Sequence, residues 1–237
     1  MKLSSPVHQL KRQAKLTARE SGMPLHAALD QLAQQEGYSS WSHLSVSGSR
    51  SGRAQKCLRQ LDGGDLVLIA ARPGQGKTLF GLELAIQASR AGGESYFFTL
   101  EYTPADVLKR VSQLGYNPAE MRDAFHLDCS DEICASYIIN ELRDAPHKTL
   151  VVIDYLQLLD QKRQNPELSS QLNVLKEFAR KTGIIIALIS QVQRDFDLAS
   201  KSLPDLSDIR LPNPVDLTVF TKSCFLHSGE IAFEMAN

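Results

Sequence analysis

Cysteine is scarce in this chain, and long apolar runs are absent. Four cysteines in 237 residues are too few for a disulfide scaffold, and no Cys-x-x-Cys pair or histidine at zinc spacing accompanies them. No apolar run approaches the ~20 residues that cross a bilayer, and residues 1–6 lack the apolar core of an export signal. The composition, 43% apolar and 22% charged, excludes global disorder and collagen-like structure. We therefore expect a globular, cytoplasmic protein with reduced thiols and no membrane partner.

A large excess of one charge is also missing, because the formal net charge is −1. The charge is nevertheless uneven: residues 1–56 hold eight basic and three acidic side chains, a net charge of +5, and the remainder carries −6. This split favours two units, of which the small basic one is the better candidate for contacting nucleic acid. A solvated helix face explains the same charges equally well. The candidate DNA contacts in this unit are Lys11, Arg12 and Lys15.

The first 45 residues are predicted to form a small basic helical module. Pro6 and Gly22 bracket one amphipathic helix, and Pro24 and Gly37 bracket a second. A third short turn would carry Trp41. The run of serine and glycine that follows is typical of a flexible linker. We therefore expect a module at residues 1–45, a linker at 46–55 and a larger domain at 56–237.

The larger domain alternates between strand and helix patterns. This alternation predicts an α/β fold with a mostly parallel, twisted sheet flanked by helices on both faces. Expected strands cover residues 66–71, 95–100, 124–127, 150–154, 184–190, 217–221 and 230–235. Expected helices cover residues 77–90 and 133–142, begin at Pro104 and Pro118, and continue from Pro166 to Arg180.

A phosphate-binding loop is the strongest motif. The sequence ARPGQGKT at residues 71–78 follows an apolar strand and opens a helix, as a P-loop requires. Gly74 and Gly76 let backbone N–H groups converge on phosphate oxygens, Lys77 reaches the β- and γ-phosphates, and the Thr78 hydroxyl suits Mg²⁺. Ala71 departs from the glycine of the general pattern. The predicted nucleotide-binding residues are Arg72, Pro73, Gly74, Gln75, Gly76, Lys77, Thr78 and Leu79.

Three polar residues end the predicted strands beside this loop. Asp154 closes an apolar strand in the Walker B manner and would hold Mg²⁺. Glu101 follows the strand after the P-loop helix, where a carboxylate can act as general base on water. Gln191 could hydrogen-bond the γ-phosphate and respond to its loss. A turn aspartate, an exposed loop glutamate and a solvated strand-end glutamine are the alternative interpretations.

Taken together, these motifs resemble the replicative DNA helicase family of the DnaB type. The resemblance rests on ARPGQGKT at 71–78, TLE at 99–101, VVIDYLQLL at 151–159, and ISQ at 189–191 with Arg194. Further similarity lies in LSDIR at 206–210 and VDL at 215–217. It implies a RecA-like ATPase core that hydrolyses ATP with Mg²⁺ and moves along single-stranded DNA, normally as a hexameric ring. By position it implies that Lys77 and Thr78 bind nucleotide and Mg²⁺, that Asp154 is Walker B, and that Glu101 and Gln191 are the catalytic carboxylate and the sensor.

Two departures from that family stand out. The short N-terminal module does not resemble the long helical domain of these helicases. The family also supplies a lysine and an arginine, two residues apart on a late strand, to the neighbouring subunit's ATP. Alignment places Lys222 and Cys224 there, which implies a missing arginine finger. Because such a finger is worth ~10³–10⁵ in rate, we expect slow hydrolysis or a finger supplied by another protein.

The expected channel-facing loops carry further candidate DNA contacts. In RecA-like rings the loops after the Walker B and sensor strands face the channel, and basic residues there bind phosphates without sequence preference. Neighbouring aspartates dilute this charge, so solvated loops are the alternative. The candidate residues are Lys162, Arg163, Arg194 and Arg210.

Three functions therefore remain open. The first is a DnaB-like ATPase acting on DNA, in replication or in maintenance of a mobile element. The second is an ATP-binding regulator with weak or no hydrolysis that docks a helicase, another replication protein or DNA. The third is a recombinase-like or clock-type ATPase of the same fold, because fold alone does not settle function.

Overall fold

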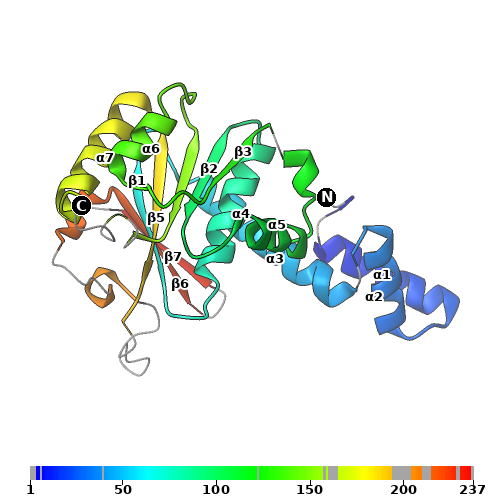
Figure 1. Cartoon of the computed structure of the whole chain (residues 1–237). Helices are drawn as coiled ribbons and strands as arrows, with labels where there is room; N and C mark the ends of the chain where they lie inside the picture. The colour runs from blue at the N-terminus through cyan, green and yellow to red at the C-terminus, as the bar shows by residue number, and fades with distance from the viewer. Residues whose placement is uncertain are drawn as a thin grey trace.

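A seven-stranded sheet forms the centre of the computed structural model (Figure 1). The structure describes residues 4–5, 7–38, 40–121, 123–156, 159, 165–193, 204–209, 215–227 and 230–235. Its strand order is β3-β2-β4-β5-β1-β6-β7, and all neighbouring pairs are parallel except β6 with β7. The predicted α/β class with a mostly parallel sheet is confirmed. The strands are β1 Leu66–Ala71, β2 Ser95–Thr99, β3 Phe125–Asp128, β4 Leu150–Asp154, β5 Ile185–Gln191, β6 Lys222–His227 and β7 Glu230–Met235.

Two apolar layers bury the faces of this sheet. All residues of β1 and β4 are buried, as unbroken runs of Leu, Ile and Val in central parallel strands require. Helices α3, α4 and α5 pack on one face, and α6 and α7 pack on the other (Figure 1). The longer helices are α3 Trp41–Leu58, α4 Lys77–Arg90, α5 Pro104–Gln113, α6 Ala135–Glu141 and α7 Leu168–Thr182. No described helix has the length and apolarity needed to cross a membrane.

Local capping sets several of these boundaries. The Thr103 hydroxyl accepts a hydrogen bond from the Asp106 amide, and the Asp106 carboxylate accepts from the Thr103 amide, a reciprocal capping box at the start of α5. Helix α7 ends at Gly183, whose φ of +73° is a left-handed conformation that glycine adopts without strain.

Three N-terminal helices form a small apolar cluster of their own. Helices α1 Val7–Ser21 and α2 Leu25–Gln35 lie between the proline and glycine signals that predicted them. Together with the start of α3 they bury Leu10, Ala33 and Leu44, with Trp41 packed alongside. In Figure 1 α1 and α2 lie beyond α3, away from the sheet.

The predicted linker at residues 46–55 is wrong, because this segment is helical. Helix α3 runs without a break from Trp41 to Leu58. Serine and glycine cost up to ~1 kcal/mol each in a helix relative to alanine. The helix nevertheless continues because its last turns bury Ala54 and Cys57 in the apolar layer that includes α4. The division into a module at 1–45 and a domain at 56–237 remains a prediction.

Two further local expectations are corrected. The strand expected at residues 217–221 is a short 3-10 helix, η4 Leu217–Val219, and the strand begins at Lys222. The Asp216 side chain accepts a hydrogen bond from the Thr218 amide at 2.9 Å, and such local bonds compete with strand pairing. The helix expected from Pro118 is a single 3-10 turn, η1 Pro118–Met121. A further 3-10 turn is η3 Leu206–Asp208.

Candidate nucleotide-binding site

The strand register brings the predicted site residues to one edge of the sheet. Ala71 at the end of β1 pairs with Gln191 at the end of β5, and Thr99 at the end of β2 pairs with Asp154 at the end of β4. Strands β4 and β5 are themselves neighbours. The carboxyl ends of four adjacent parallel strands therefore meet where open α/β sheets bind ligands.

The P-loop has the backbone geometry of an anion site. Gly74 and Gly76 have φ values of +77° and +78°, and a Cβ atom at either position would meet nothing within 4 Å. The requirement for glycine is therefore conformational rather than steric. Helix α4 begins at Lys77 with no acidic residue in its first turn. Its N-terminal amides and positive dipole end are thus available to phosphate.

The predicted nucleotide-binding residues all lie on this loop or the first turn of α4. Lys77 is half-buried and Thr78 is buried. The remaining loop positions lie at or near the surface: Arg72, Pro73, Gly74, Gln75 and Gly76, with Leu79 half-buried in the helix.

Gly81 is a further residue on α4 that sequence reasoning did not identify. A Cβ atom there would lie 2.6 Å from Cδ1 of Ile189 and 3.1 Å from Cγ1 of Val152. Glycine at this position lets α4 approach β4 and β5 closely, which fixes the P-loop against the sheet. The sequence offered one signal of this close packing, a glycine five residues after Gly76 within a mainly apolar helix.

Asp154 is fully buried, and its carboxylate is the least satisfied group at this edge. Neither oxygen has a hydrogen bond of normal geometry to a described residue. Burial raises the pKa of Asp154 to about 6, and the charge of Glu101 adds to this. The nearby Thr78 hydroxyl and the charges of Lys77 and Arg110 act in the opposite direction. A buried carboxylate lacking a partner costs free energy unless something binds it.

These residues fit a magnesium–nucleotide complex. A hydroxyl and a carboxylate are oxygen donors of the kind Mg²⁺ prefers, with phosphates and water completing its octahedron. The unpartnered Asp154 oxygens and the Thr78 hydroxyl would provide the protein ligands. Across the described ranges no cluster of three or more His, Cys, Asp or Glu exists.

Glu101 and Gln191 flank this centre at the ends of β2 and β5, the two strands on either side of β4. Glu101 is exposed just beyond β2, and its amide donates to the Thr99 hydroxyl at 3.2 Å. Gln191 is half-buried at the end of β5. The amide of the next residue, Val192, donates to the Ala71 carbonyl at 3.0 Å, which holds the end of β5 against the base of the P-loop.

The candidate DNA contacts fall into two groups. Lys11, Arg12 and Lys15 are exposed on α1, which lies away from the nucleotide edge (Figure 1). The loop candidates Lys162, Arg163, Arg194 and Arg210 lie outside the described residues.

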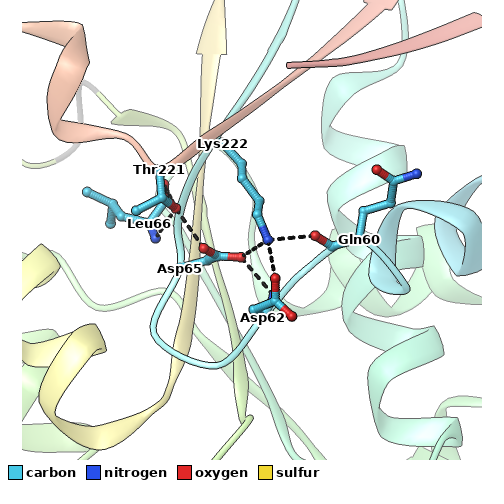
Figure 2. A network of polar contacts seen from close by, with 6 residues as sticks. All are labelled: Gln60, Asp62, Asp65, Leu66, Thr221 and Lys222. Carbon is cyan, nitrogen blue, oxygen red and sulfur yellow. Dashed lines mark hydrogen bonds and ion pairs between the residues drawn. The ribbon is translucent and has the colours of Figure 1, made fainter. Parts of the chain in front are cut away.

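Lys222 and Cys224 are not positioned to reach a neighbouring subunit's nucleotide, so that expectation is wrong. Strand β6 runs parallel to β1, and Lys222 pairs with Val67 near the start of β1. This is the edge opposite the P-loop. Figure 2 shows the Lys222 ammonium bound within its own chain, 2.6 Å from carboxylate oxygens of both Asp62 and Asp65 and 2.7 Å from the Gln60 carbonyl. Cys224 is fully buried in the core.

Several known proteins are similar to this chain in sequence. The family model for the DnaB-like helicase C-terminal domain matches residues 53–117 and 120–216. The replicative DNA helicase DnaB of Mycoplasma genitalium is 29% identical over 206 residues, covering 70% of this chain and 44% of that protein. A probable plasmid replicative DNA helicase of Chlamydia trachomatis is 28% identical over 182 residues, covering 62% of this chain and 39% of that protein.

Solved structures give the same fold. A DnaB-like replicative helicase superposes with a TM-score of 0.58 at 20% sequence identity, covering 74% of this chain and 54% of that one. This likeness and the parallel sheet confirm the RecA-like architecture. The match spans less than half the length of the curated helicases above. The family model, by contrast, covers more than half of this chain, which therefore belongs to the DnaB-like helicase C-terminal domain family.

Proposed function

We propose that this protein binds ATP with Mg²⁺ at the P-loop edge of its sheet and hydrolyses it while acting on DNA. The observation that carries the proposal is the meeting of the P-loop, the unpartnered Asp154, Glu101 and Gln191 at the ends of four adjacent strands. A fold kept only as a scaffold has no physical need for a buried carboxylate without a partner.

Binding is assigned to the P-loop and to α4. The loop amides and Lys77 would hold the β- and γ-phosphates, and Thr78 and Asp154 would hold Mg²⁺. A Mg²⁺ ion bound there would neutralise charge on the phosphate oxygens. The P-loop remains open to this ligand because Pro73, Gly74 and Gln75 are exposed.

Hydrolysis is assigned to Glu101 and Gln191. Glu101 is exposed, so its carboxylate can reach a water molecule beside the γ-phosphate and accept its proton. Gln191, anchored near Ala71 by the strand pairing, would hydrogen-bond the γ-phosphate and relay its loss to the segment that follows.

DNA is the proposed polymer substrate because the matching proteins are named as replicative helicases. Single-stranded DNA would contact the basic residues of the loops, and Lys11, Arg12 and Lys15 of α1 would form a second contact. A homo-oligomer, a hexameric ring in the simplest case, and a helicase or replication partner belong to the same proposal. Because ATP and replicating DNA are the substrates, we also propose a cytoplasmic location.

The regulator alternative loses its main argument. It required an arginine finger to be replaced by Cys224, yet Cys224 and Lys222 lie in the core and at the opposite edge. The position of Cys224 therefore says nothing about the rate of hydrolysis.

The test is steady-state ATP hydrolysis with and without single-stranded DNA, beside a nucleotide-binding titration. We expect Lys77→Ala to lose nucleotide binding, and Glu101→Gln to retain binding while kcat falls ~10²–10⁴-fold. The matched controls are Lys181→Ala and Glu177→Gln, which alter an exposed ion pair on α7 and should change neither quantity. Tight ATP binding by Lys77→Ala would refute the P-loop assignment. Wild-type protein without turnover in either condition would refute the proposed ATPase.

A further inference from the structure

The loop that carries Glu101 is held to α5 by a stacked arginine. The guanidinium carbon of Arg110 lies 4.1 Å from the centroid of the Tyr102 ring. Tyr102 directly follows Glu101 in the chain and packs against the apolar layer of α4 and α5. An arginine stacked on an aromatic face at this distance is attracted by the ring quadrupole and fixed in orientation. The stack therefore restrains the residue next to Glu101.

Hydrogen bonds hold the same loop at both of its ends. The loop is pinned at one end by the Glu101 amide, which donates to Thr99, and at the other by the capping box of Thr103 and Asp106. Both contacts act on residues or atoms other than the Glu101 carboxylate, which is exposed. Between these ends, the Arg110–Tyr102 stack connects the residue next to Glu101 to the body of α5, in addition to the packing of Tyr102 on the apolar layer.

Arg110 also retains hydrogen-bonding capacity in a desolvated position. Its Nε is buried and has no hydrogen-bond partner among the described residues, and a buried donor in that state costs free energy. The charge of Arg110 reaches the nucleotide edge, where it acts to lower the pKa of Asp154. Arg110 therefore contacts the residue next to Glu101 and also acts electrostatically on the nucleotide edge.

We propose that Arg110, stacked on Tyr102, is a positioning residue that aligns Glu101 for hydrolysis. The proposal rests on the proposed ATPase function, in which Glu101 is the general base. A base must be held within a few tenths of an ångström of its productive position. Misplacement by 1 Å costs roughly 10²-fold in rate.

The test compares kcat, KM and nucleotide affinity in single variants. Arg110→Met keeps the length of the side chain and removes its charge, and Tyr102→Ala removes the ring. Each should lower kcat about 10–100-fold with little change in nucleotide affinity. Tyr102→Phe keeps the ring and should restore most of the activity that Tyr102→Ala removes. A general loss of folding would lower nucleotide affinity together with kcat, whereas the positioning role lowers kcat alone.

The matched control uses a second arginine over a ring. Arg90 at the end of α4 lies 5.4 Å from the Tyr116 ring centroid. It is thirteen residues beyond Lys77, roughly 20 Å along the helix axis. Arg90→Met removes the same kind of contact at a distance from the nucleotide edge, so kcat should stay within about twofold of wild type.

A double variant decides whether Arg110 acts through Glu101. In a Glu101→Gln background, Arg110→Met should lower the residual rate less than twofold, because residues acting as one unit are not additive. A further drop equal to that of the single variant would overturn the inference, as would unchanged kcat in Arg110→Met. Turnover that depends on Glu101 but not on Arg110 overturns this inference alone. Wild-type protein without turnover overturns the proposed function and this inference with it.

Discussion

Replacing Lys222 by methionine tests the buried ion-pair network most directly. The Lys222 side chain is 6% exposed and lies 2.6 Å from carboxylate oxygens of Asp62 and Asp65 (Figure 2). The two partners differ in environment, because the Asp65 side chain is 11% exposed and that of Asp62 is 86% exposed. Lys222→Met keeps an unbranched side chain of similar length and leaves the Asp65 carboxylate buried without its cation.

The cost follows from what remains around Asp65. Removing one partner of a buried ion pair typically costs about 3–5 kcal/mol. Asp65 keeps two hydrogen bonds, from the Thr221 hydroxyl at 2.8 Å and from the Asp62 amide at 2.7 Å. We therefore expect the lower end, a loss of about 3 kcal/mol in the free energy of unfolding. For a chain of this size that is about 6–12 °C in Tm.

Urea unfolding followed by circular dichroism at neutral pH measures this loss. Asp62→Asn is the matched control, since it removes the charge of an equally close partner of the same ammonium at an exposed position and should have little effect. The double variant Lys222→Met with Asp65→Asn removes both buried charges and should recover most of the loss. If Lys222→Met lost less than about 1 kcal/mol, the ammonium would not be buried at this edge, and Lys222 would not be committed to this network.

The pH dependence of this network has a defined sign. Burial alone would lower the pKa of Lys222, but hydrogen bonds and charges from Asp62 and Asp65 outweigh it and raise the pKa above its usual value. The stability that the charged Lys222 contributes is therefore complete below the usual lysine pKa and is lost as pH rises through the raised pKa of Lys222. Lys222 conversely lowers the pKa of Asp62, so that contribution is present above the usual aspartate pKa and is lost as pH falls through the lowered one.

Three further predictions address the site and the helical module. Asp154→Asn should weaken Mg²⁺-dependent nucleotide binding, yet it should stabilise the protein at pH 7.5 by about 3 kcal/mol because it removes a buried charge whose pKa is raised to about 6. The cost of that charge is full above pH 6 and fades as pH falls toward 3.8, so urea unfolding at pH 5 should show a smaller gain. A variant less stable than wild type at both pH values would contradict the burial argument. Gly81→Ala should lower the free energy of unfolding by about 1–3 kcal/mol through overpacking and should lower nucleotide affinity. Gly52→Ala on α3, where a Cβ meets nothing, should do neither. Equal effects of the two variants in unfolding and nucleotide titrations would show that α4 does not need its close approach to β4 and β5. Replacing Lys11 and Lys15 by glutamine should reduce the salt dependence of single-stranded DNA binding by ~0.7 for each phosphate that the variant no longer neutralises, and an unchanged slope in fluorescence anisotropy would exclude α1 from DNA binding.

The central sheet and the P-loop were predictable because their signals are local. Strands such as Leu150–Asp154 are mainly apolar runs. A strand followed by glycines and Lys-Thr is the sequence signature of a P-loop. The meeting of Asp154 and Gln191 at one edge then follows from parallel pairing, because parallel strands end on the same side. Part of the candidate site could therefore be assembled from the sequence alone.

The remaining features depend on contacts that are distant in sequence. Lys222 and Asp65 are neighbours only because β6 pairs with β1, and nothing in residues 215–237 indicates which end of β6 the lysine occupies. The steric requirement for glycine at position 81 comes from the close approach of Ile189, which is distant in sequence. The serine- and glycine-rich stretch of α3 has the composition of a linker, but packing of its end against the domain keeps it helical.

The continuity of α3 makes it a lever arm between the two ends of the molecule. Its 18 residues span roughly 27 Å. One end is seated against α4, where Gln55 donates to Gln87 at 3.0 Å, and the other end carries Leu44 into the cluster with α1. A tilt of about 10° at the seated end displaces the far end by about 5 Å. Small movements of the P-loop helix would therefore reach the basic face of α1 enlarged.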